Sequence, residues 1–134
     1  MADPIGALVL ILRADINLTR VFGGELPAEE TASMPASAIV IRPSGGISLT
    51  GNSNVEHDTL RVDLFGYGPT PRDAMALVER AGLALRRVQR RVAAGTLVHW
   101  VNSAGGYSSG REPDTDWPRV WQSFQLFYAL ETVA

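Results

Sequence analysis

The 134-residue chain contains no cysteine and no lysine, and it has only two histidines. Without cysteine, disulfides, thiolate metal sites and cysteine nucleophiles are excluded. Without lysine, the phosphate-binding lysine of a P-loop is excluded as well. All 12 positive side chains are therefore arginines, whose planar guanidinium groups suit carboxylate partners. The net charge of −2 argues against a dedicated nucleic-acid-binding protein, which is usually basic.

Long apolar runs are also absent. No segment approaches the roughly 20 apolar residues that cross a bilayer, so we expect no membrane partner. The apolar N-terminal stretch has Asp3 where a signal peptide carries positive charge, and we interpret it as a helix. The hydrophobic content of 46% and the charged content of 19% are typical of a folded globular chain. Its length predicts a single domain over residues 1–134.

No set of reactive side chains can be assembled from this sequence. Residues 106–110, GYSSG, match the G-x-S-x-G pattern of hydrolases. The residues that follow cannot begin the helix this motif requires, and no histidine comes after His99. His57 and His99 each lack a second ligand at metal-binding spacing. We therefore expect no catalytic, cofactor or metal site, and no enzymatic activity.

The N-terminal segment has the signals of an amphipathic helix. Asp3 is a suitable cap and Pro4 a suitable first residue. Gly23-Gly24 provides a left-handed stop for it. Its apolar stripe is formed by Ile5, Leu8, Leu12 and Ile16.

Residues 70–95 are predicted to form the second and longer helix. Thr70 would cap it, Pro71 would be its first residue and Gly95 would close it. Its apolar stripe at helical spacing consists of Ala74, Leu77, Val78, Ala81, Leu85, Val88 and Val92.

The stretch LRRVQRR, residues 85–91, places four arginines on the opposite side of this predicted helix: Arg86, Arg87, Arg90 and Arg91. A solvent-exposed face is the plain interpretation of such a pattern. Leu83 lies in the middle of the charged face, and a large apolar residue ringed by arginine points to a partner surface.

Four further segments have strand character: 37–42, 57–68, 96–102 and 117–133. Polar loops at 44–58 and 103–116 separate them. The last strand is apolar on both faces, with Trp121 and Phe127 on one of them, so both faces need a cover. The order α-β-β-α-β-β predicts a single α+β domain, in which a mainly antiparallel sheet of about four strands carries two helices on one face.

Four regions together resemble the tail-terminator, or tail-completion, proteins of long-tailed bacteriophages and related prophage or gene-transfer particles. They are RVFGGELP, SAIVIRPSGG, EHDTLRVDLFGYGPTPRDAMALVERAGLAL and VWQSFQLFYAL. The join between the RVDLFGY strand and the helix beginning PRDA is the most telling of them.

The resemblance implies a structural protein of the virion tail or neck, assembled in the host bacterial cytoplasm. It would form a homohexameric ring on the major tail tube protein, stop tube polymerisation and meet the head-completion or connector protein. Residues implied to face the tube or a neighbouring subunit are Ile47, Leu49, Asn52, Asn54, Leu83, Tyr107, Trp121 and Phe127. The four arginines would pair with carboxylates of a neighbouring subunit or line a channel for passing DNA.

Three other functions are alternatives at this point. One is another neck, connector or minor tail protein. The second is a small nucleic-acid-binding module that contacts phosphates through arginine. The third is a small enzyme, for example a hydrolase, which ranks last because no nucleophile, base and orienting group can be assembled.

Overall fold

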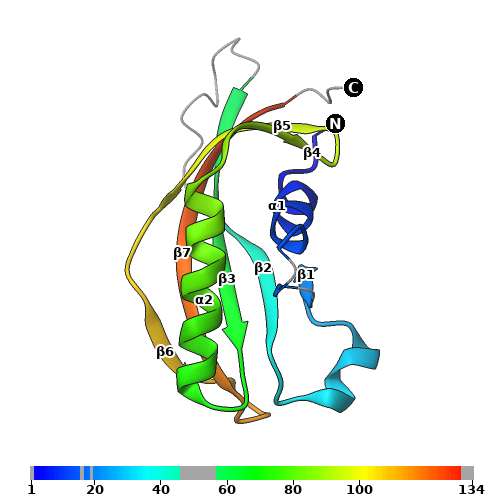
Figure 1. The fold of residues 1–134 in the computed structure, drawn as a ribbon, viewed down its shortest axis with the longest axis vertical. Helices are drawn as coiled ribbons and strands as arrows, with labels where there is room; N and C mark the ends of the chain where they lie inside the picture. The colour runs from blue at the N-terminus through cyan, green and yellow to red at the C-terminus, as the bar shows by residue number, and fades with distance from the viewer. Residues whose placement is uncertain (1, 16, 19, 46–56, 131–134) are drawn as a thin grey trace.

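A computed structural model describes residues 2–15, 17, 18, 20–45 and 57–130 (Figure 1). The helices are α1 (Pro4–Arg13), the 3₁₀ helix η1 (Ala28–Ser33) and α2 (Pro71–Arg86). The strands are β1 (Val21–Gly23), β2 (Ala38–Gly45), β3 (His57–Tyr67), β4 (Gln89–Ala93), β5 (Thr96–Ser103), β6 (Ser108–Arg111) and β7 (Pro118–Ala129). The predicted α+β class is confirmed, but the described part of the chain has seven strands rather than about four, so the predicted element order is wrong.

The strands form one sheet in the order β1-β2-β3-β7-β5-β4, with β6 also paired to β7. Only β1 and β2 run parallel, and the other pairs are antiparallel. β5 and β6 follow one another along the same edge of β7, and the Ala104 N–H bonds to the Ser123 carbonyl between them. The prediction of a loop over residues 103–116 is therefore wrong at Ser108–Arg111, which form β6. There the chain pairs again with the edge of β7 after a short break.

The two α-helices, α1 and α2, lie on the same side of the sheet and share one hydrophobic core with it (Figure 1). Their inward stripes meet the inward-facing residues of the long strands, which are fully or almost fully buried. The members from the sheet include Ile39, Ile41, Val62, Leu64, Val98, Val101, Val120, Phe124 and Leu126. The prediction of two helices on one face agrees with this arrangement.

Helix α2 begins where the sequence predicted, but it ends well before the predicted end at residue 95. Thr70 accepts a hydrogen bond from the Asp73 N–H at 3.2 Å, and Pro71 is the first residue. The helix stops at Arg86, and residues 89–93 form β4. Ala94 and Gly95, at φ 50° and 69°, then make the two-residue turn that joins β4 to β5. Val92, predicted to be buried, is 50% exposed on this strand.

The N-terminal helix is confirmed at its start, where the Asp3 carboxylate accepts a hydrogen bond from the Gly6 N–H at 3.0 Å. It ends at Arg13, because Asp15 accepts a hydrogen bond from the Asn17 N–H and so favours a local turn over a further helical turn. Gly23 belongs to β1 and is not part of a helix stop, which corrects the prediction. Ile16 lies outside the described residues.

Candidate functional site

The face of the sheet away from the helices is the helix-free face. Successive residues of a strand point to opposite faces, and β7 alternates strictly between buried and half-buried residues from Pro118 to Phe127. The half-buried set lies on the helix-free face and includes Trp121 and Phe127. No helix of the described ranges covers this face. The last strand, which was predicted to be apolar on both faces, therefore has one face available to a partner.

One end of the helix-free face carries an arginine–aromatic patch, formed by Arg42, Phe65, Arg119 and Trp121. The Phe65 and Trp121 rings are 6.3 Å apart on neighbouring strands. The Arg119 guanidinium lies 5.0 Å from both ring centroids, and that of Arg42 lies 5.2 Å from Phe65. Such stacking uses the flat face of each guanidinium and leaves its N–H edge for acceptors.

One carboxylate lies near this patch, because Asp63 is directly opposite Arg42 in the β2–β3 register. Neither Arg42 nor Arg119 forms a salt bridge with a carboxylate of the described residues. Arg42 donates from Nε to the Gly24 carbonyl at 2.7 Å, and the buried Nε of Arg119 has no hydrogen-bond partner there. The patch therefore presents cations that fit a carboxylate-bearing partner.

The other end of the helix-free face carries a histidine–aromatic cluster of His57, His99, Trp100 and Phe127. Phe127 lies at its centre, with ring centroids 5.6 Å from His57, 5.3 Å from His99 and 5.7 Å from Trp100. The two imidazoles are 4.8 Å apart. Burial lowers the pKa of His99, and the nearby charges of His57 and Arg90 lower it further.

This lowered pKa predicts a pH dependence of stability. The unfolded chain binds a proton at His99 more readily than the folded chain, starting near the ordinary pKa of 6.5. The contribution of neutral His99 is therefore present above that pH and is lost as the pH falls below it. We expect the thermal midpoint to drop between pH 7.5 and 5.0, and to drop less in His99→Gln. Calorimetry of both proteins across this range measures the difference, and equal slopes would contradict the prediction.

The four arginines do not share one helix face, which corrects the sequence prediction. Arg86 ends α2 and lies 6.0 Å from the Phe124 ring centroid, and Arg87 is the residue after the helix. Arg90, at φ 47°, and Arg91 belong to β4. All four are exposed, and none forms a salt bridge with a carboxylate of the described residues. They remain close in sequence around the α2–β4 junction, but they extend from two different elements.

Leu83 and Tyr107 are exposed, as expected of partner-facing residues. Leu83 is 49% exposed on α2, beside a surface hollow of about 180 Å³ that Asp15, Arg80, Ala84 and Arg87 also line. Arg80 donates two hydrogen bonds to Asp15, at 2.9 and 3.1 Å, and this contact lowers the pKa of Asp15. Tyr107 is 40% exposed in the break between β5 and β6.

The predicted loop residues Ile47, Leu49, Asn52 and Asn54 lie outside the described residues. The structure adds Arg42, Phe65 and Arg119, which were not among the predicted site residues. The alternation in RVDLFGY already placed Phe65 opposite the buried residues, so its face was predictable. Its neighbours were not, because they depend on how three strands align.

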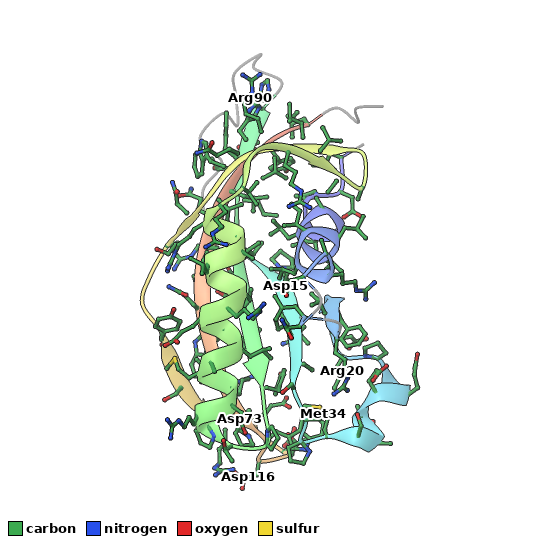
Figure 2. The ribbon with its side chains drawn as sticks, viewed as in Figure 1. Asp15, Arg20, Met34, Asp73, Arg90 and Asp116 are labelled. Atoms are coloured by element: carbon green, nitrogen blue, oxygen red, sulfur yellow. The ribbon has the colours of Figure 1, made fainter. Side chains whose placement is uncertain are left out.

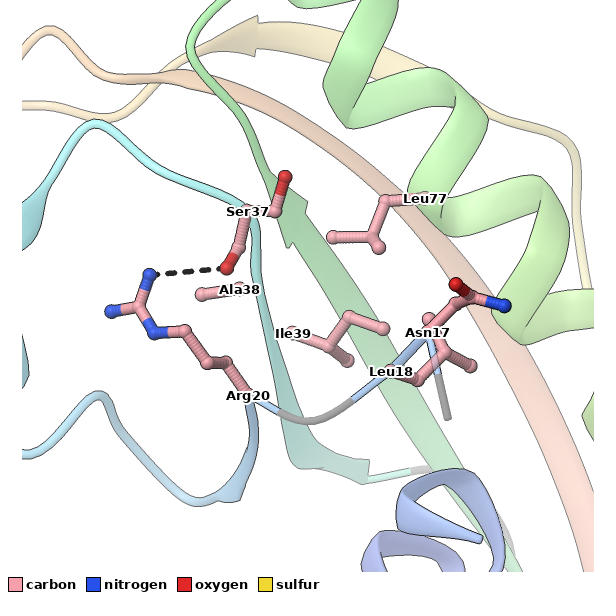
Figure 3. Close-up of a pocket in the computed structure, with 7 residues that line it drawn as sticks. All are labelled: Asn17, Leu18, Arg20, Ser37, Ala38, Ile39 and Leu77. Atoms are coloured by element: carbon pink, nitrogen blue, oxygen red, sulfur yellow. Dashed lines mark hydrogen bonds between the residues drawn. The ribbon is translucent and has the colours of Figure 1, made fainter. Parts of the chain in front are cut away.

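Two hollows among the described residues are both smaller than an ordinary small-molecule pocket. A hollow beside β2 has a volume of about 160 Å³, below the roughly 300–1,000 Å³ of ordinary ligand pockets (Figure 3). It is lined by Asn17, Leu18, Arg20, Ser37, Ala38, Ile39 and Leu77. Among residues 2–45 and 57–130 as described, no three histidine, aspartate or glutamate side chains gather to hold a metal ion.

The helices of the described ranges are all too short or too polar to span a bilayer.

Comparison with known proteins identifies a shared fold. No protein-family model and no curated protein matches the chain. A similar solved chain comes from a structure described as "Virion of native gene transfer agent (GTA) particle". The two chains superpose with a TM-score of 0.70 over 92% of each, at 15% sequence identity. At this identity, the likeness is one of fold.

Proposed function

We propose that this chain is a structural subunit of a phage-like particle and that it forms the ring that terminates the tail tube. The observation that carries the proposal is the fold shared with a chain of a gene transfer agent virion, over 92% of both chains. The tail-terminator resemblance of residues 56–85, which contain the strand-to-helix join, supports the finer assignment. The open helix-free face supports a role in assembly rather than in chemistry.

A terminator needs a ring whose two sides differ. The two ends of the long axis carry different side chains: Arg90 lies at one end, and Asp73 and Asp116 lie at the other (Figure 2). Copies related by a rotation axis would place like ends together, which gives the ring two unlike faces. One face would match the tube and the other would not, so that polymerisation ends there. The connector would bind the second face.

The arginines around the α2–β4 junction have two candidate partners in such a ring. A carboxylate of an adjacent protein is the first, because arginine suits planar bidentate pairing. DNA passing through the channel is the second, since phosphate contact needs only charge and no sequence readout. The contribution of Ile47, Leu49, Asn52 and Asn54 to tube contact stays a prediction.

The proposed function predicts where the protein binds on tail tubes. We expect tubes assembled from the major tail protein with this chain present to carry a ring at one end and to stop growing. Tubes assembled without it should keep lengthening. Negative-stain electron microscopy with tube-length measurement tests this. Density along the tube wall would indicate a minor tail protein instead, and binding only to the connector would indicate another neck protein.

A further inference from the structure

An acidic arm projects from the sheet edge between β1 and β2. It comprises residues 24–37 and contains η1, none of whose residues is buried. The arm extends away from the two core helices, and η1 makes almost no contact with the other helices and strands (Figure 1). The arm therefore presents most of its side chains to solvent or to a partner.

Arg20 holds the base of this arm in place. Its guanidinium donates to the carbonyls of Ser37 and Glu30, to the Ser33 hydroxyl and to the Glu30 carboxylate at 3.0 Å. Figure 2 shows Arg20 and Met34 together at this position. Arg42 also donates to the Gly24 carbonyl at 2.7 Å, where the arm begins, so contacts of two arginines hold the arm in place.

Two of the three glutamates of the arm form no salt bridge with an arginine of the described residues. Glu30 is paired with Arg20, whereas Glu25 and Glu29 are exposed and form no salt bridge with a described arginine. Leu26 and Met34 lie half-buried on the same segment. The arm therefore combines free carboxylates with apolar side chains.

The arginine–aromatic patch has the complementary character. Arg42 and Arg119 are cations that form no salt bridge with a described carboxylate, and Phe65 and Trp121 offer apolar surface. Phe65, Arg119 and Trp121 lie on β3 and β7, in the middle of the sheet. Arg42 lies on β2 and donates to the Gly24 carbonyl where the arm begins, but η1 lies further along the arm. Arm and patch are therefore two unlike surfaces of one chain, and two unlike surfaces are what a closing, head-to-tail contact requires.

We infer that the acidic arm of one subunit docks on the arginine–aromatic patch of a second copy of this chain. Glu29 of the arm faces Arg119 of the patch, and the apolar arm residues cover Phe65 and Trp121. This contact rests on the proposed ring and identifies the surfaces that close it. Charge pairs across such an interface mainly set which partner binds and in which orientation.

Charge reversal tests the contact in solution. We expect Glu29→Arg and Arg119→Glu each to raise the concentration of half-assembly at least about tenfold, as measured by light scattering. Mixing the two single variants should restore the ring, because each defective arm then meets a matching defective patch. Glu79→Arg and Arg72→Glu, exposed on α2, are the matched controls and should assemble like wild type. Rings unaffected by Glu29→Arg would overturn the inference.

Engineered disulfides give a second test that leaves every charge in place. The chain has no cysteine, so the only sulfur atoms able to cross-link are those introduced. Ala28 is exposed on the arm, and Ser108 is exposed opposite Trp121. Under oxidation, the double variant Ala28→Cys/Ser108→Cys should form a ladder of covalent multimers, whereas a mixture of the two single variants should give dimers only.

The two tests separate this inference from the proposed function. A wild-type ring that forms no ladder and survives charge reversal would overturn the arm–patch contact and leave the terminator role standing. A wild-type chain that stays monomeric at high concentration, with or without tubes, would overturn both. If circular dichroism shows that Arg119→Glu does not fold, the cross-linking of the Ala28→Cys/Ser108→Cys variant decides between these outcomes.

Discussion

We expect Phe124→Ala to lower the free energy of unfolding by about 3–5 kcal/mol, because it removes a large side chain from a core that cannot collapse around the gap. Phe124 is fully buried on β7, the strand that pairs with β3, β5 and β6. It meets α2 closely: a Cβ atom on Gly82 would lie 3.3 Å from its ring. Urea unfolding at a fixed protein concentration, with an unchanged slope, measures the loss.

Phe127→Ala is the matched control for this prediction. Phe127 lies on the same strand but on the helix-free face, where it is half-buried and contacts other rings rather than α2. Losing these aromatic contacts and a half-buried side chain should cost less than the core substitution, about 1–2 kcal/mol. Equal losses for the two variants would show that the helix-free face is packed like a core, contrary to the arrangement described above.

The sequence predicted best those elements whose signals are local. The start of α2 depends on Thr70 and Pro71, which are adjacent in sequence, and the alternation of β3 depends only on its own residues. The same local reasoning failed at β4. Val88 and Val92 continue the helical spacing, yet Val92 pairs with Leu97 across a hairpin. Pairing with β5 outweighed helix periodicity there, and the Ala-Gly turn was the available signal.

The candidate site was predicted in part, for a related reason. Trp121 and Phe127 were placed on the same face of the last strand, and they do share it. They nevertheless belong to different groups, one with Phe65 and Arg119 and the other with His99. Which side chains become neighbours depends on the register of β7 against β3 and β5. The sequence of one strand does not contain that register.

The second large effect is expected where α2 approaches β3. Gly66 lies under the helix, and a Cβ atom there would come within 2.4 Å of the Val78 Cγ2 and 3.2 Å of the Ala74 carbonyl oxygen. Because valine is stiff and the carbonyl belongs to the helix backbone, α2 has to move outward. We expect Gly66→Ala to cost about 1–3 kcal/mol of unfolding free energy, measured by urea unfolding.

Two controls determine whether close approach is the cause. Gly105→Ala adds the same methyl group where no atom lies within 4 Å, so it should be neutral or slightly stabilising. Val78→Ala removes the methyl group that clashes. In that background, Gly66→Ala should lower the free energy of unfolding by less than it does in the wild type, so the two effects are not additive. Strictly additive losses would mean that Gly66 matters through the strand backbone and not through its contact with α2. In that case the separation between helix and sheet would not be set by this glycine.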